Sequence, residues 1–199
     1  GYITTATGIY STAMGGGSLA SAPTSTAMGY NTIASGNNST AMGGQSTASG
    51  NNSTAMGSNT LASGEKSIAM GESTAATGDY STAMGSNTTA SGDNSTAMGW
   101  EATASDYSST VIGQHNSSGS TATSATSFST LAPAFVIGNG VDASNKSDAF
   151  SVLFNGNTTI GGSLTLNGTE ITATGTELNY VDGVTSSIQT QLDSKQIAI

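Results

Sequence analysis

The chain has 199 residues, of which 35% are hydrophobic and only 8% are charged, and it contains 27 Gly and no Cys. Twelve acidic and three basic residues give a formal net charge of −9, which would repel a phosphate backbone and an anionic membrane surface, so we expect no nucleic-acid partner. Without Cys there are no disulfides, thiolate nucleophiles or zinc–thiolate sites. No apolar run approaches the roughly 18 residues of a membrane span, so we expect no membrane insertion in this segment.

Residues 1–114 repeat with a period of 14. A pentad, Ser-Thr-Ala-Met-Gly in most copies, begins at Ser11, Ser25, Ser39, Ser53, Ser67, Ser81, Ser95 and Ser109. A looser pentad runs seven residues out of phase, as in 46–50, and Gly followed by Asn or Asp punctuates the units, which is typical of turns. Each unit therefore predicts two strands of about five residues and two turns, and stacked units predict an all-β fold, a parallel β-roll.

Alternation along the first pentad assigns side chains to two faces. Two sheets joined by two-residue turns leave little room between them, so we expect Ser11, Ala13, Gly15 and their equivalents inside. The alternative is that the methionines fill the interior and the alanines face water. In the preferred arrangement an exposed apolar ladder marks an interface suited to cyclic packing. The trimer-contact candidates on this ladder are Met14, Met28, Met42, Met56, Met70, Met84, Met98 and Ile112.

The repeat resembles the YadA-type head of trimeric autotransporter adhesins, whose unit reads Asn-Ser-Val-Ala-Ile-Gly followed by Ser-x-Ala-x-Gly. The matching residues here are 38–43, 52–57 and 94–99, which read Asn-Ser-Thr-Ala-Met-Gly, and the resemblance covers about Gly1 to Gln114. It implies a left-handed parallel β-roll, a homotrimer and an extracellular role in adhesion. Thr replaces Val and Met replaces Ile, so an inherited ligand such as collagen is not carried over.

Residues 115–175 are expected to form a smaller β-rich neck. A Ser/Thr/Gly run over 115–132 precedes apolar strands interrupted by Asn-Gly at 139–140, 155–156 and 167–168, a pattern that predicts hairpins. This stretch resembles a module that often follows such heads in fibrous surface proteins and phage tail fibres. Residues 176–184 are similar to a segment in tail-fibre proteins of marine phages and large viruses.

Residues 176–199 are expected to begin a trimeric coiled-coil stalk. Ser186 and Gln189 fit a capping box, after which a helix starts. Val181, Ile188 and Leu192 lie roughly at coiled-coil spacing, and Ile188 and Leu192 are further trimer-contact candidates.

Catalytic and metal chemistry find little support in the sequence. His115 is the only histidine and lies at an expected turn, where we interpret it as solvated surface without a supporting acid. Four acids recur near turns, at Glu65, Glu72, Asp79 and Asp93, and we interpret them as lying out of register with one another. We therefore expect no bound metal, no cofactor and no enzymatic activity.

Aromatic residues at turns are the candidates for ligand binding. They replace the Asn, Ser or Gly of neighbouring repeats, and aromatic platforms stack on sugars or anchor protein partners. The alternative is incidental variation at solvated turns. The candidates are Trp100, Tyr30, Tyr80, Tyr10 and Tyr107.

These observations lead us to expect a trimeric adhesive fibre segment, part of a viral or phage tail fibre on the virion surface, that binds a host glycan or protein receptor. The alternatives are a bacterial cell-surface adhesin and a purely structural fibre spacer. A remote alternative is an ice-binding solenoid with a rank of Thr at Thr12 and its equivalents, although the second rank there is Met.

Overall fold

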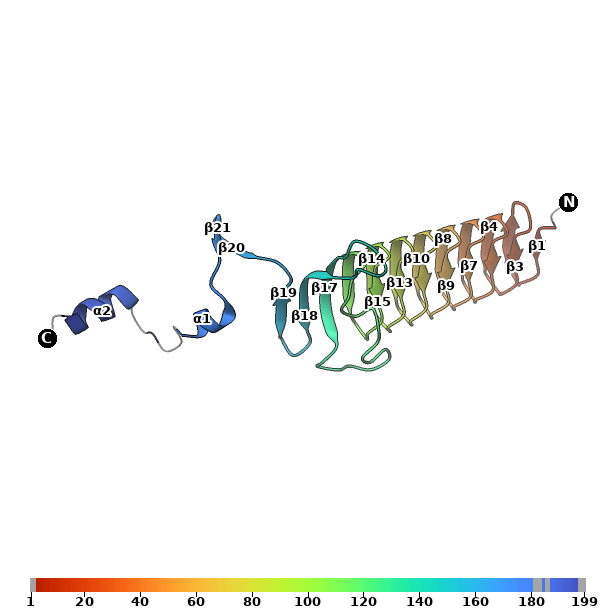
Figure 1. Cartoon of the computed structure of the whole chain (residues 1–199). Coiled ribbons are helices and arrows are strands. Elements are labelled where there is room, and N and C mark those ends of the chain that lie inside the picture. The colour runs from red at the N-terminus through yellow and green to blue at the C-terminus, as the bar shows by residue number, and fades with distance from the viewer. Residues whose placement is uncertain (1–2, 181–183, 185–186, 197–199) are drawn as a thin grey trace. The chain divides into compact units, whose positions relative to one another are not determined.

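The computed structural model describes residues 3–180, 184 and 187–196 and divides the chain into two compact units, Gly1–Gly161 and Gly162–Ile199. The first unit is a β-solenoid, in which coils with one long and one short strand stack in a row (Figure 1). The short strands form an eight-stranded sheet and the long strands belong to an eleven-stranded sheet. The expected all-β roll is confirmed for this unit.

The short strands are β1 (Thr5–Ala6), β3 (Leu19–Ala20), β5 (Ile33–Ala34), β7 (Thr47–Ala48), β9 (Leu61–Ala62), β11 (Ala75–Ala76), β13 (Thr89–Ala90) and β15 (Thr103–Ala104). The long strands of the coils are β2 (Thr12–Met14), β4 (Thr26–Tyr30), β6 (Thr40–Gly44), β8 (Thr54–Ser58), β10 (Ile68–Glu72), β12 (Thr82–Ser86), β14 (Thr96–Trp100) and β16 (Thr110–Gln114).

Neighbouring coils pair in parallel at the 14-residue step, so Ala69 lies beside Ala83 and Met70 beside Met84. From β4 onward the long strands of the coils reach the expected five residues, whereas β2 has three, and the short strand of each coil has only two. After β5, for example, the N–H groups of Ser35 and Gly36 both donate to the carbonyl of Ala48. The turn therefore begins directly after the two-residue strand.

The interior is built from small side chains, as the alternation predicted. The second residue of nearly every strand in the coils is an alanine, such as Ala27 or Ala34, and it is fully buried. Hydroxyl residues such as Ser25 and Thr32 are also fully buried. The alternative with buried methionines is therefore wrong.

The glycines of the first pentad are a correction to that prediction, because they lie outside the interior. Gly29 and Gly57 are only half-buried, with φ of 133° each, and most of their equivalents are exposed. At these residues the backbone leaves the extended region, so the period-2 alternation that would turn them inward stops after Met.

The long sheet continues beyond the repeats. β17 (Pro133–Asn139) pairs in parallel with β16, and β18 (Asp148–Leu153) and β19 (Thr158–Ile160) follow antiparallel. Residues 117–132 instead take the place of a further coil over the short sheet, where the N–H of Ser105 donates to Gly119 and that of Tyr107 to Ser124. The part of the expected neck that contains β17 to β19 thus shares its sheet with the repeats, whereas the part of 115–175 that lies in the second unit forms a separate two-stranded sheet.

The second unit contains β20 (Leu164–Leu166) and β21 (Thr169–Ile171), a hairpin around Asn167 and Gly168, whose φ values of 48° and 79° are those of the expected Asn-Gly turn. α1 (Gly175–Asn179) has a capping box between Thr174 and Glu177, which the sequence analysis missed.

α2 (Ile188–Gln196) follows, with the Oγ of Ser187 accepting the N–H of Thr190. Gln189 donates to Asp193, while its expected capping partner Ser186 and the coiled-coil position Val181 lie outside the described residues. Neither α1 nor α2 is long and apolar enough to span a membrane.

Candidate functional site

The outer face of the long sheet, which we call the Thr–Met face, carries two side-chain rows. One row is the threonines, with Ile68 in one coil, and the other is the methionines followed by Ile112. Met14 and Met56 are exposed and the remaining methionines are half-buried, so the ladder lies outside the interior as expected. An apolar row on an exposed sheet face is typical of an interaction surface.

Both rows continue past the repeats onto β17, where Phe135 pairs with Thr110 and Ile137 with Ile112. The sequence analysis did not identify these positions. The available signal was the alternation of 135–137, which copies that of 110–112 around a buried valine.

The five aromatic candidates do not form one site. Tyr10, Tyr80 and Tyr107 lie in turns that lead into the long strands, whereas Tyr30 and Trp100 are the last residues of β4 and β14. They therefore occupy two different edges of the roll. Tyr30 and Trp100 share an edge and are 46% and 47% exposed, but five coil steps separate them.

Tyr80 belongs to a small charged cluster on its edge. The Nζ of Lys66 lies 3.1 Å from Tyr80 Oη and 3.1 Å from a Glu65 carboxylate oxygen. The hydrogen bond to Tyr80, followed by the interactions with Glu65, raises the pKa of Lys66 above its ordinary value, and the ammonium group is paired with the Glu65 carboxylate in this turn.

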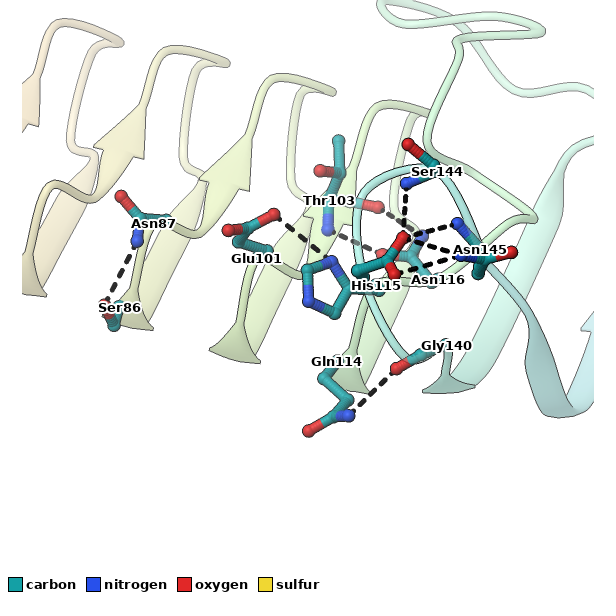
Figure 2. A network of polar contacts seen from close by, with 11 residues as sticks. Ser86, Asn87, Glu101, Thr103, Gln114, His115, Asn116, Gly140, Ser144 and Asn145 are labelled. Carbon is teal, nitrogen blue, oxygen red and sulfur yellow. Dashed lines mark hydrogen bonds and ion pairs between the residues drawn. The ribbon is translucent and has the colours of Figure 1, made fainter.

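The ring of Trp100 packs against the ring of His115. The two rings meet edge to face with centroids 4.7 Å apart. His115 is only 2% exposed, and its Nδ1 lies 3.2 Å from a carboxylate oxygen of Glu101 (Figure 2). The His115 ring therefore packs against the Trp100 side chain and leaves part of the indole exposed.

The burial of His115 corrects the expectation of a solvated histidine. The segment after β17 covers it, since Ser147 donates its N–H to the carbonyl of His115, and Gln114 binds the carbonyl of Gly140 through its Nε2. These covering residues lie far along the chain, so the local sequence could not reveal them.

Asn116 closes the last coil next to His115. Its side-chain amide accepts the N–H of Thr103 and donates to the carbonyl of Thr103, both at 2.8 Å (Figure 2). The same amide also donates to the carbonyl of Ser118 at 2.7 Å. The side chain thus provides the backbone partners that the next coil would supply to β15.

The connection 140–147 is closed by Asp142, whose carboxylate accepts the side-chain amide of Asn145 and the N–H groups of Ser144 and Asn145. These hydrogen bonds, the one from the Asn145 side chain first, hold the pKa of Asp142 below its ordinary value.

Three of the four acids considered above do lie in register, which corrects the expectation. Asp79 Oδ1 accepts the N–H of Glu65 at 2.8 Å, and Asp93 Oδ1 accepts that of Asp79 at 2.9 Å, while Glu72 lies on the opposite edge. These carboxylates serve as backbone acceptors between coils. Within the described ranges no group of three or more His, Asp or Glu residues is arranged to hold a metal ion.

Comparison with known proteins matches the repeats to one family. The family model described as YadA head domain repeat (2 copies) matches four consecutive segments, residues 6–32, 34–60, 62–88 and 90–116, which cover more than half of the chain. Curated proteins give no match to the chain. Each matched segment spans about two coils of the solenoid, so the family repeat and the structural repeat coincide.

Proposed function

The chain belongs to the YadA head family, and from this premise we propose that it is a segment of a homotrimeric, extracellular adhesive fibre that attaches to a host surface. The observation that carries the proposal is the Thr–Met face, an outward sheet face whose methionine row recurs at each coil step and ends in Ile112. A linear repeat with one apolar face can bury that face by closed packing around an axis. The candidates Ile188 and Leu192 are both exposed on α2 and would extend the contact if a stalk follows.

The first test is the mass of the full chain in solution. One chain has a mass of 19.5 kDa, so light scattering should give three times that value. A stable monomer at micromolar concentration would refute the proposed assembly.

We assign the fibre to a viral or phage tail because residues 176–184 are similar to a segment of tail-fibre proteins. A bacterial surface adhesin is the alternative origin. Antibodies raised against residues 1–113 should label virions and leave uninfected cells unlabelled. Labelling of the bacterial surface in the absence of virus would assign the chain to the alternative.

Receptor contact is assigned to the exposed aromatics, with Trp100 first. Its ring is held by His115 and stays 47% exposed, and a rigid aromatic surface loses little conformational entropy when a sugar or a protein side chain stacks on it. The fibre segment is proposed to act by binding alone, with no catalytic step.

The Trp100→Ala variant should bind intact host cells at least tenfold more weakly than the native chain in a fluorescence-labelled binding assay, which corresponds to about 1.4 kcal/mol. Tyr30→Ala is the comparison variant, since Tyr30 is another candidate on the same edge with nearly the same exposure. Equal loss in both variants would point to several weak platforms instead of one site.

A structural spacer is the second candidate function. It is favoured by the distribution of the aromatics over two edges and by the lack of any pocket in the described part of the chain. Absence of binding of the native trimer to host cells would favour the spacer over the adhesin.

A further inference from the structure

We propose that the receptor group recognised at Trp100 is the ammonium group of a lysine side chain on a protein partner, held between the Trp100 ring and the Glu101 carboxylate. The inference rests on the proposed function, which assigns receptor contact to Trp100, and it specifies the chemistry of that contact. It is supported by the arrangement of the two side chains, by an ammonium group bound in the same manner on the other edge of the roll, and by the local charge.

Trp100 and Glu101 are adjacent residues that pack on one buried group. The rings of Trp100 and His115 have their centroids 4.7 Å apart, and a Glu101 carboxylate oxygen lies 3.2 Å from His115 Nδ1. His115 is buried, whereas the Trp100 residue is 47% exposed and the Glu101 side chain 35%. The aromatic ring and the carboxylate are therefore presented together to solvent at the end of β14.

The opposite edge of the roll shows how such a pair binds an ammonium group. The Nζ atom of Lys66 lies 4.7 Å from the centroid of the Tyr80 ring and 3.1 Å from a Glu65 carboxylate oxygen. There, one aromatic ring and one carboxylate hold a lysine of the same chain. Trp attracts a cation more strongly than Tyr does.

At Trp100 the carboxylate has a different neighbour. Glu101 lies against His115, which is charged only when it is protonated. Beside a neutral imidazole, the Glu101 carboxylate therefore keeps a negative charge with which an ammonium group from another molecule can pair. The Trp100 ring supplies the second contact, as Tyr80 does for Lys66.

The polar side chains beside Trp100 favour this ligand over a sugar. Ser86 and Gln114 flank Trp100 in the neighbouring coils. The Ser86 hydroxyl accepts the Asn87 amide at 3.3 Å (Figure 2). The Gln114 amide donates to the carbonyl of Gly140 at 2.9 Å. Both side chains are thus already engaged, whereas a sugar needs several placed polar groups and an ammonium group needs only the ring and the carboxylate.

The charge around Trp100 also favours a cation. Glu72 lies in the same column as Trp100, two coil steps away. The connection after β17 adds one acid, Asp142, and one base, Lys146. Together with Glu101 the acids outnumber the bases on this side, so the local potential attracts a cationic group and repels an anionic one.

The first experiment uses the single Trp of the chain as its reporter. The full chain is titrated with Nα-acetyl-lysine methylamide at about pH 8, where an imidazole is ordinarily neutral, and the indole N–H resonance is followed by NMR. We expect a saturable shift with a Kd in the millimolar range, and at least about fivefold weaker binding of the same probe acetylated on Nε, which has lost its charge. Equal binding of the two probes, or a saturable shift with N-acetylglucosamine and none with the lysine probe, would overturn the inference.

Two variants separate the local charge from the charge of the whole molecule. Glu101→Gln keeps a side-chain oxygen that can face His115 and removes the charge, so it should weaken binding of the lysine probe about threefold. Glu72→Gln is the matched control, because two coil steps place its charge about 10 Å away, where salt largely screens it, and the Kd should not change. Equal effects of the two substitutions would assign the binding to overall charge and contradict the proposed pairing.

A cell-binding assay distinguishes failure of this inference from failure of the proposed function. Acetylation of the lysines on host-surface proteins should lower binding of the full chain at least about tenfold, as the Trp100→Ala substitution should. Cell binding that depends on Trp100 but survives acetylation would overturn the inference and leave the adhesin standing. Binding of the lysine probe by a chain that does not attach to host cells would refute the adhesive role and support the ligand chemistry assigned to Trp100 and Glu101.

Discussion

At the scale of single residues, glycine sets the distance between coils. A Cβ built on Gly57 would overlap the carbonyl oxygen of Gly71 in the next coil, and the same holds for the other glycines in this column. The φ of 133° at Gly57 also lies where other residues are strained. The column therefore lets the backbones of neighbouring coils stack directly at these positions.

Gly57→Ala should destabilise the protein by more than about 1 kcal/mol, because strain and the overlap with Gly71 act together. Gly44→Ala is the matched control, since a Cβ there meets nothing within 4 Å, and it should stay within about 0.5 kcal/mol of the native chain. Urea unfolding followed by circular dichroism measures both. Equal midpoints for the two variants would contradict the steric explanation.

Asn116 is the residue that ends the short sheet. Asn116→Ala would leave the N–H and C=O groups of Thr103 and the carbonyl of Ser118 without these partners, which should cost on the order of 2 kcal/mol. Asn157→Ala, an exposed position in the connection between β18 and β19, should change the free energy of unfolding by less than about 0.5 kcal/mol. Thermal unfolding of the two variants provides the comparison.

At the scale of elements, segment 117–132 works as a cap. The edge of an open sheet presents unpaired N–H and C=O groups that promote aggregation. Asp106 is fully buried under this segment, and one of its carboxylate oxygens accepts the N–H groups of both Thr123 and Ser124. An irregular segment can thus cover β15 because a side chain fixes its position.

The connection 140–147 should loosen in acid. The pKa of Asp142 lies below the ordinary value of 3.8, so its stabilising contribution is present above the unfolded-state pKa and is lost as the pH falls through the lower folded-state pKa. Proton–deuterium exchange of the Asn145 amide, followed by NMR, should accelerate below about pH 4. The Asp142→Asn variant should remove this pH dependence, and an unchanged exchange profile in that variant would assign it to another group.

At the scale of the whole molecule, assembly and folding should be coupled. The buried hydrophobic side chains are alanines and two valines, so an isolated roll buries little apolar area to offset the chain entropy lost on ordering. Burial of the Thr–Met face in a trimer would supply the missing area.

Coupling of this kind makes the melting temperature depend on concentration. A tenfold increase in chain concentration should raise the Tm of the full chain by about 2 to 4 °C, because unfolding releases three chains from one particle. Differential scanning calorimetry over two decades of concentration measures the shift. A constant Tm would show that each chain unfolds on its own.

Most of the repeat region could be predicted because its contacts follow one fixed step. Every neighbour of a residue such as Ala69 or Met70 in the next coil lies 14 positions away, so period and alternation alone place alanine inside and methionine outside. The Asn167-Gly168 hairpin was predictable for a similar reason, since its turn geometry is a property of two adjacent residues.

Only the tertiary structure shows how the chain continues after β16, where the 14-residue spacing between paired strands ends. Val111 pairs with Val136, across the cap 117–132, and this pairing of segments distant in sequence carries the Thr–Met face onto Phe135 and Ile137. The connection 140–147 that follows β17 then covers His115. The outward position of the column glycines also became clear only from the tertiary structure, since a positive φ at Gly57 breaks the alternation from which an inward direction was inferred. The sequence by itself determined the coil, because the forces that shape it act between neighbours at a constant spacing. The end of the roll and its continuous apolar face arise from contacts between distant segments, whose spacing no local pattern records.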